Sequence, residues 1–217
     1  MRQDALEKDL TILRKVTENY EGPIVERQHR RRSPFRTLVS VLLSARTKDE
    51  VTGPATDRLF KAARTPQEMA GLSQKRIEEL IYPVGFYKTK AKHIKQTSRI
   101  LVQDFCGKVP ETTDELLSLP GIGLKSANLM LGVVFGKPAI CVDTHVHRIT
   151  NRWGYVKTKT PAQTEQALRV KLPRKYWVEI NRLLVIYGQN VCTPISPYCS
   201  ECKIKRFCNK TGVTRSR

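Results

Sequence analysis

The sequence predicts an all-α fold, and three observations lead to that expectation. Segments such as DALEKDLTILRKV and AKHIKQTSRILVQDF repeat apolar residues at intervals of three and four, the period of an amphipathic helix. Residue types that cap helices stand before several such segments, at Ser33, Thr65, Thr112 and Thr160. No segment alternates apolar and polar residues with the period of two that marks a half-buried strand.

Start and stop signals place the helices in order along the chain. Ser33 and Pro34 begin the segment PFRTLVSVLLSAR, with proline at the first helical position, where its missing N–H removes no hydrogen bond. Residues 65–68 (TPQE) form a capping box, and residues 160–163 (TPAQ) repeat the pattern. On these signals we expect about ten helices and no strand. Four glycines stand where helices are expected to end: Gly107, Gly136, Gly154 and Gly188.

The charge of the chain indicates a polyanionic partner. Its 217 residues include 39 lysines and arginines against 20 aspartates and glutamates, a net charge of +19. Solubility does not require such an excess, whereas binding to nucleic acid does. The charge says nothing about chemistry.

The apolar segments of the sequence are short. The N-terminal segment MRQDALEKDL lacks the apolar core of a secretory signal. No run approaches the ~18 consecutive apolar residues that a membrane-spanning helix needs. We therefore expect a soluble, monomeric cytoplasmic protein that makes no membrane contact and is associated with the nucleoid if its source is a prokaryote.

Four of the six cysteines lie near the C-terminus with the spacing C-x6-C-x2-C-x5-C: Cys192, Cys199, Cys202 and Cys208. This segment has no helical period and few large apolar residues, so a metal centre is the expected source of its order. The spacing leaves zinc and a [4Fe–4S] cluster both open, because four thiolates suit either and only one C-x2-C pair is present.

Three basic residues lie between the last two of these cysteines. Lys203, Lys205 and Arg206 are interpreted as contacts to phosphate, the alternative being that they only offset the charge of the metal centre. The other two cysteines, Cys106 and Cys141, have apolar neighbours and are expected to be buried.

The segment LPGIGLKSANLML, residues 119–131, predicts a tight turn between two helices. Gly121 and Gly123 permit the turn and let the backbone approach a partner closely. The first amides of the second helix can then donate to an anion such as a DNA phosphate, a contact that does not depend on base sequence. The alternative is an ordinary helical hairpin packed in the core.

Lys125 begins the second of these helices, where the positive end of the helix dipole disfavours a cation. One interpretation is a further phosphate contact. The other is a neutral amine, favoured by the dipole and by partial burial, that acts as a nucleophile and forms a Schiff base.

Asp143 ends the apolar segment AICVD and precedes the predicted helix THVHRITNRWG. A carboxylate at this position is suited to cap the helix. If it also faces a cleft, it can stabilise positive charge on a sugar or accept a proton.

These segments together resemble the endonuclease III family of the helix-hairpin-helix DNA glycosylase superfamily. The matching segments are SPFRTLVSVLLSARTKD, VGFYKTKAKHI, VPETTDELLSLPGIGLKSANLML, VDTHVHRI and the cysteine tail, in the family's order and across about residues 33–208. The hairpin alone is moderately specific, whereas its combination with the lysine, the aspartate and this cysteine spacing is highly specific.

The resemblance implies two helical domains with a DNA cleft between them. Residues 27–137 would form a six-helix barrel with the helix-hairpin-helix motif at about 112–135. Residues 1–26 and 138–217 would form the second domain, which carries a [4Fe–4S] cluster in its cysteine loop. The resemblance, and not the spacing, favours iron–sulfur over zinc.

The resemblance also implies an activity, that of a bifunctional DNA N-glycosylase/AP lyase of base excision repair. Such an enzyme flips damaged, oxidised pyrimidines out of double-stranded DNA and removes them. Lys125 matches the family's nucleophilic lysine, which forms a Schiff base, and Asp143 its catalytic aspartate. β-Elimination then cuts the strand 3′ to the abasic site.

Two residues depart from the family's usual pattern. Arg46 stands where well-known bacterial members have glutamine, at the position that fills the gap left by the flipped nucleotide. Arginine can fill the gap and pair with the orphaned base, so the preferred opposing base is open. Phe86 stands where leucine is frequent and is interpreted as a wedge into the base stack, with packing in the core as the alternative.

Two other functions fit parts of the pattern. A monofunctional mismatch or uracil glycosylase could use the same scaffold, but such enzymes typically lack lysine at the position of Lys125. A non-catalytic DNA-binding module could use the hairpin and cysteine loop as clamps, but it leaves the pair of Lys125 and Asp143 unexplained.

Overall fold

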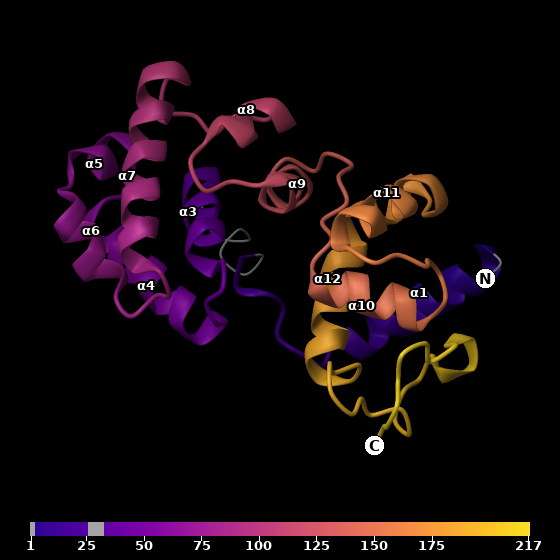
Figure 1. The fold of residues 1–217 in the computed structure, drawn as a ribbon. Helices are drawn as coiled ribbons and strands as arrows, with labels where there is room; N and C mark the ends of the chain where they lie inside the picture. The colour runs from indigo at the N-terminus through magenta and orange to yellow at the C-terminus, as the bar shows by residue number, and fades with distance from the viewer. Residues whose placement is uncertain (1–2, 26–32) are drawn as a thin grey trace. The chain divides into compact units, whose positions relative to one another are not determined.

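The protein is described here by a computed structural model, which covers residues 3–25 and 33–217, and every regular element within them is a helix (Figure 1). The all-α prediction is confirmed. No helix in the described part combines the length and apolar character needed to cross a membrane. The elements are α1 (Gln3–Thr17), α3 (Pro34–Ser44), α4 (Asp49–Ala62), α5 (Pro66–Gly71), α6 (Gln74–Ile81), α7 (Tyr87–Asp104), α8 (Thr113–Ser118), α9 (Leu124–Val133), α10 (Thr144–Arg152), α11 (Pro161–Lys171), α12 (Trp177–Asn190) and the 3-10 helices η1 (Arg174–Tyr176) and η2 (Lys205–Phe207).

The chain divides into two compact units. One is continuous, Pro23–Lys137, and the other joins Met1–Gly22 to Pro138–Arg217. The expected domain boundary between residues 26 and 27 lies outside the described residues.

The continuous unit is organised around α7, which packs against α3, α5 and α6 (Figure 1). α7 buries Ala91, Ile94 and Leu101 completely on one face, as the spacing of three and seven residues requires. α8 packs on α9, and α9 in turn packs on α3. The hairpin between α8 and α9 and the end of α3 are therefore supported by one helical framework.

The second unit has its core around α12, which packs against α1, α10 and η1. Tyr187 and Leu184 of α12 are buried among apolar side chains from α1 and α10. Three cysteines of the tail, Cys192, Cys202 and Cys208, pack against this cluster. The tail thus lies on the apolar core of this unit.

The predicted helix caps are present. The side chains of Ser33, Thr65, Thr112 and Thr160 each accept a hydrogen bond from a backbone N–H in the first turn of the helix that follows. At Thr65 the capping box is complete, because the side chain of Glu68 also accepts from the backbone N–H of Thr65, at 3.3 Å.

Two expectations from the sequence are wrong. Gly188 does not end a helix but lies inside α12, where a Cβ would come within 2.4 Å of Nδ1 of His145, so close approach of α10 requires glycine there. Cys106 is exposed, because it adopts a left-handed conformation (φ 52°) in the turn after α7, whereas Cys141 is buried as expected.

Candidate functional site

The predicted hairpin lies between α8 and α9, and its two glycines differ. Gly121 has φ of +83°, and a Cβ there would lie 2.6 Å from Nδ1 of His93 and 3.0 Å from Cδ2 of Leu42. Gly123 is in an extended conformation with nothing within 4 Å of a Cβ. Only Gly121 is therefore required by the fold itself. Gly123 is the N-cap of α9 and has no side chain to accept from the first turn, which leaves those N–H groups suited to an anion.

Lys125 is the second residue of α9, and its side chain is exposed. The expected partial burial is wrong, because the buried face of α9 is formed by Ala127, Asn128 and Leu131. Its position in the first turn of α9 is as the sequence predicts.

Asp143 is the N-cap of α10, as the sequence predicts. Its Oδ1 accepts the backbone N–H groups of both His145 and Val146 at 2.9 Å. The preceding residues Cys141 and Val142 are buried, and Asn181 of α12 donates to the Cys141 carbonyl at 3.1 Å. The carboxylate is therefore held in a fixed orientation, half-buried, with both of these hydrogen bonds made to one of its two oxygens.

Arg46 and Phe86 lie beside each other although 40 residues separate them. Both have positive φ, 53° and 57°, and the guanidinium carbon of Arg46 lies 5.9 Å from the centre of the Phe86 ring. Phe86 is 64% exposed, so it does not pack in the core. Non-glycine residues seldom adopt this conformation, and two such side chains side by side on the surface indicate a functional constraint.

The four tail cysteines line one pocket. The sulfurs of Cys192 and Cys202 accept hydrogen bonds: Arg152 Nη1 donates to the first at 3.3 Å and the Tyr187 hydroxyl donates to the second at 3.1 Å. Burial raises the pKa of the Cys192 and Cys208 thiols. Among residues 3–25 and 33–217, no group of three or more His, Cys, Asp or Glu side chains is arranged as a metal-binding set. The three basic residues that follow, Lys203, Lys205 and Arg206, are exposed.

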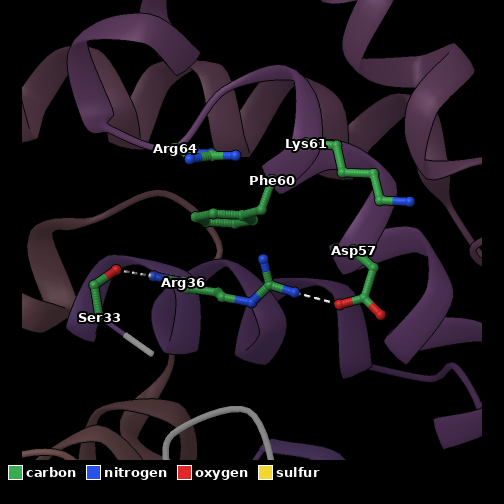
Figure 2. Close-up of a pocket in the computed structure, with 6 residues that line it drawn as sticks. All are labelled: Ser33, Arg36, Asp57, Phe60, Lys61 and Arg64. Atoms are coloured by element: carbon green, nitrogen blue, oxygen red, sulfur yellow. Dashed lines mark hydrogen bonds and ion pairs between the residues drawn. The ribbon is translucent and has the colours of Figure 1, made fainter. Parts of the chain in front are cut away.

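Figure 2 shows a pocket between the start of α3 and the end of α4 that contains none of the predicted site residues. The guanidinium of Arg36 pairs with Asp57 and lies 4.7 Å from the centre of the Phe60 ring. Arg64 lies on the opposite side of that ring, and Lys61 points away from it (Figure 2). This pocket adds to the basic surface of the continuous unit.

Comparison with known proteins assigns the chain to a family. A family model described as "HhH-GPD superfamily base excision DNA repair protein" matches residues 39–174, which is more than half of the chain. The chain belongs to this HhH-GPD superfamily. Endonuclease III of Thermotoga maritima is 49% identical over 182 residues, which cover 84% of this chain and 85% of the relative. Endonuclease III of Escherichia coli is 37% identical over 201 residues, 93% of this chain and 94% of the relative.

Solved structures agree with this assignment. A trapped endonuclease III–DNA covalent intermediate, an estranged-adenine complex, matches this HhH-GPD chain with a TM-score of 0.86 and 31% identity over 97% of each chain. A thermostable thymine-DNA glycosylase matches with a TM-score of 0.79 at 21% identity, a likeness that shows only the common fold. The predicted family is confirmed, and the similarity favours the endonuclease III group.

One residue of this HhH-GPD chain escaped the sequence analysis. Lys90 of α7 is 6% exposed, and its ammonium donates to groups at the end of α3 and in the loop beyond it. The signal was present in the helical period, because Lys90 precedes Ala91 and lies four residues before Ile94 on the buried face of α7. A lysine in that register is seldom buried, so the helical period alone does not predict its burial.

Proposed function

We propose that this chain is a base excision repair enzyme, a DNA glycosylase and AP lyase that acts on double-stranded DNA containing damaged bases or abasic sites. The observation that carries the proposal is its similarity over nearly its whole length to endonuclease III, including a structure named as a covalent DNA intermediate. The net charge of +19 supports a polyanionic partner independently.

Lys125 is the proposed nucleophile. After the damaged nucleotide is flipped out of the stack, its Nζ attacks C1′ of the sugar while the bond from C1′ to the base breaks and the base takes the electron pair. Nζ must be unprotonated for this step. The sugar ring opens to a Schiff base, a proton leaves C2′, and the 3′ phosphate departs in β-elimination.

Asp143 is the proposed electrostatic partner in this step. Positive charge develops on the sugar as the glycosidic bond breaks, and a fixed carboxylate can stabilise that charge and accept the proton released from the Lys125 amine. The two N–H groups that bind Oδ1 keep the side chain in place before the reaction begins. Such preorganisation lets the carboxylate act without reorientation.

Two further groups of residues are proposed to bind DNA. The exposed pair Arg46 and Phe86 would occupy the gap left by the flipped nucleotide, with the Phe86 ring as the wedge. Phosphate contacts are proposed for the backbone at the hairpin glycines and for the basic residues of the tail: Gly121, Gly123, Lys203, Lys205 and Arg206. Oxidised pyrimidines are the proposed lesions, on the resemblance to the family alone.

The four tail cysteines are proposed to hold a [4Fe–4S] cluster. They line a single pocket, and four thiolates are the ligand set that such a cluster takes. The donors from Arg152 and Tyr187 also suit anionic sulfurs. When bound, such a cluster supplies order to a tail that has little apolar side-chain area of its own.

The deciding experiment is trapping of the Schiff base. Duplexes carrying thymine glycol, dihydrouracil, uracil or an abasic site would be incubated with enzyme and borohydride, and a covalent adduct is expected with the oxidised pyrimidines and the abasic site. Lys125→Gln should abolish the adduct while retaining affinity for lesion DNA. Undiminished trapping by this variant would transfer the nucleophile's role to another residue. Base release without any adduct in the wild type would favour a monofunctional glycosylase, and binding without either would favour a non-catalytic module.

A further inference from the structure

Lys90 is a buried cation whose hydrogen bonds all lead to the segment that carries Arg46. Its Nζ donates to the carbonyl of Leu43 at 2.8 Å, to the carbonyl of Ala45 at 2.6 Å and to Oγ1 of Thr47 at 2.9 Å. These three acceptors match the three donors of an ammonium group. The ammonium thus binds the backbone before Arg46 and the side chain of the residue after it.

The chemistry of the two carbonyl acceptors explains why the charged ammonium of Lys90 is stable in a buried position. α3 ends at Ser44, so the carbonyls of Leu43 and Ala45 belong to the last turn, whose carbonyls lack partners within the helix. A cation at a helix C-terminus is stabilised by the helix dipole. Burial lowers the pKa of Lys90 to about 8, which leaves the ammonium as the main form at neutral pH.

The same helix also carries Phe86. Phe86 is the N-cap residue of α7, one turn before Lys90, and the Lys90 N–H donates to its carbonyl at 3.0 Å. A Cβ on the adjacent Gly85 would lie 3.2 Å from the carbonyl oxygen of Arg46, so the two loops run in close contact. Lys90 therefore joins the segment bearing Arg46 to the helix that begins at Phe86.

One face of α7 continues this support toward the hairpin. His93 lies against Gly121, as the 2.6 Å distance to its Cβ position shows, and Oγ1 of Thr97 donates to the Pro120 carbonyl at 3.5 Å. Residues 90, 93 and 97 are spaced by three and four, so they share a face of the helix. This face of α7 therefore contacts the segment that carries Arg46, the turn at Phe86 and the hairpin at Gly121, which are the parts of the continuous unit proposed to bind DNA.

We propose that Lys90 is a positioning residue for lesion recognition, whose ammonium fixes the backbone around Arg46 so that Arg46 and Phe86 stand side by side and occupy the gap left by a flipped nucleotide. This inference rests on the proposed function. It assigns Lys90 no contact with DNA and no part in the chemistry at Lys125. Its effect is confined to steps that need the gap to be filled.

The test compares two substrates that differ in that need. Excision of a damaged pyrimidine from a duplex requires a filled gap, whereas borohydride trapping on a single-stranded abasic oligonucleotide does not. Lys90→Met keeps the length of the side chain and removes its charge and donors. We expect it to slow single-turnover excision from duplex by about 10–100-fold, the loss typical of a misplaced positioning group, and to leave single-strand trapping within about twofold. Lys92→Met, an exposed lysine on the same helix, removes the same charge and should change neither rate appreciably.

A spectroscopic signal separates positioning from general destabilisation. 2-Aminopurine placed opposite the lesion reports whether the estranged base is displaced, and its fluorescence increase on binding wild-type enzyme should be reduced with Lys90→Met at a temperature where circular dichroism shows both proteins folded. Lys90→Met should also add little to Arg46→Ala, because both act through the same group. Thr47→Val removes one acceptor and should show the same pattern more weakly, which keeps the test available if Lys90→Met does not fold.

The outcomes are distinct. Excision by Lys90→Met at the wild-type rate, equal losses on both substrates, or full additivity with Arg46→Ala would overturn the role of Lys90. Failure of the wild-type enzyme to form an adduct on any substrate would instead refute the proposed function, whatever the variants do.

Discussion

Arg152, the last residue of α10, donates a hydrogen bond from Nη1 to Sγ of Cys192 at 3.3 Å across 40 residues of sequence. The same guanidinium donates to the carbonyls of Thr193 and Pro194, both at 2.7 Å. Arg152 is 7% exposed. A helix of the core is thereby attached to the beginning of the cysteine tail.

Arg152→Met should destabilise the second unit. The substitution keeps much of the apolar stem but leaves two carbonyls and a sulfur without a charged donor. Hydrogen bonds to charged groups are worth about 1.5–3 kcal/mol each, so a loss of several kcal/mol is expected. Urea unfolding would measure it, and limited proteolysis should cut the tail more readily. Arg76→Met is the control, because Arg76 pairs with Glu79 at the surface and such pairs contribute at most about 1 kcal/mol. Equal losses in the two variants would contradict the anchoring role of Arg152.

Gly121→Ala and Gly123→Ala should have different effects. Gly121 has positive φ and no room for a Cβ, so alanine should lower the free energy of unfolding by on the order of 1–3 kcal/mol. Gly123 has open space, so alanine should leave stability nearly unchanged but weaken binding to undamaged duplexes of any sequence alike, because a methyl group keeps the backbone from phosphate.

Thermal denaturation and fluorescence anisotropy at several salt concentrations would separate these effects. For the wild type, log affinity should fall with log salt with a slope of about −0.9 per phosphate contacted. A smaller slope in Gly123→Ala would identify lost phosphate contacts. Unchanged affinity and slope in that variant would remove Gly123 from the proposed interface.

The local elements were readily predicted from the sequence because their signals are local. The caps at Ser33, Thr65 and Thr160 are each specified within four residues. The role of Gly188 does not follow from the sequence, because it depends on His145 of another helix and no local pattern carries that information. The exposure of Cys106 likewise follows from one left-handed backbone conformation that its apolar neighbours do not indicate.

In the candidate site, too, features set by local sequence are predictable and features set by tertiary packing are not. The position of Asp143 as a helix cap follows from the apolar segment before it and the helix after it. The proximity of Arg46 and Phe86 depends on tertiary packing of α3 and α7, as does the burial of Lys90. The roles of Lys125, Asp143 and the four cysteines stay predictions that the experiments proposed for them would test.

Asp143→Asn should slow the reaction without unfolding the protein. The amide oxygen of asparagine can still accept the N–H groups of His145 and Val146, so the cap is retained. The negative charge is lost, and a preorganised electrostatic contact of this kind is worth ~3–4 kcal/mol of barrier, or about 10²–10³ in rate. Single-turnover base release would measure the loss, with the melting temperature as the control. A rate within about threefold of wild type would exclude the electrostatic role, because so small a loss is typical of removing an exposed ion pair.

Asp9 should make the stability of the protein depend on pH in an unusual direction. Asp9 is 2% exposed on the buried face of α1, and its Oδ1 has no hydrogen-bond partner among the described residues. Burial raises its pKa from 3.8 to about 6. Above pH 6 the folded protein therefore carries a buried charge at a cost, whereas between pH 6 and 4 the folded state binds more protons than the unfolded state and gains stability as pH falls.

Asp9→Asn removes that charge, so at pH 8 it should raise the free energy of unfolding by on the order of 2–3 kcal/mol, and the difference from wild type should shrink as the pH is lowered to 4.5. Urea unfolding at both pH values would measure it. Glu7→Gln provides a control of opposite sign: hydrogen bonds from Tyr176 and Lys175 lower the pKa of the exposed Glu7, so its contribution is present at neutral pH and is lost as the carboxylate is protonated. A difference for Asp9→Asn that is the same at pH 8 and pH 4.5 would show that Asp9 is not the group that titrates, and a loss of stability at pH 8 would show that its carboxylate has a favourable partner.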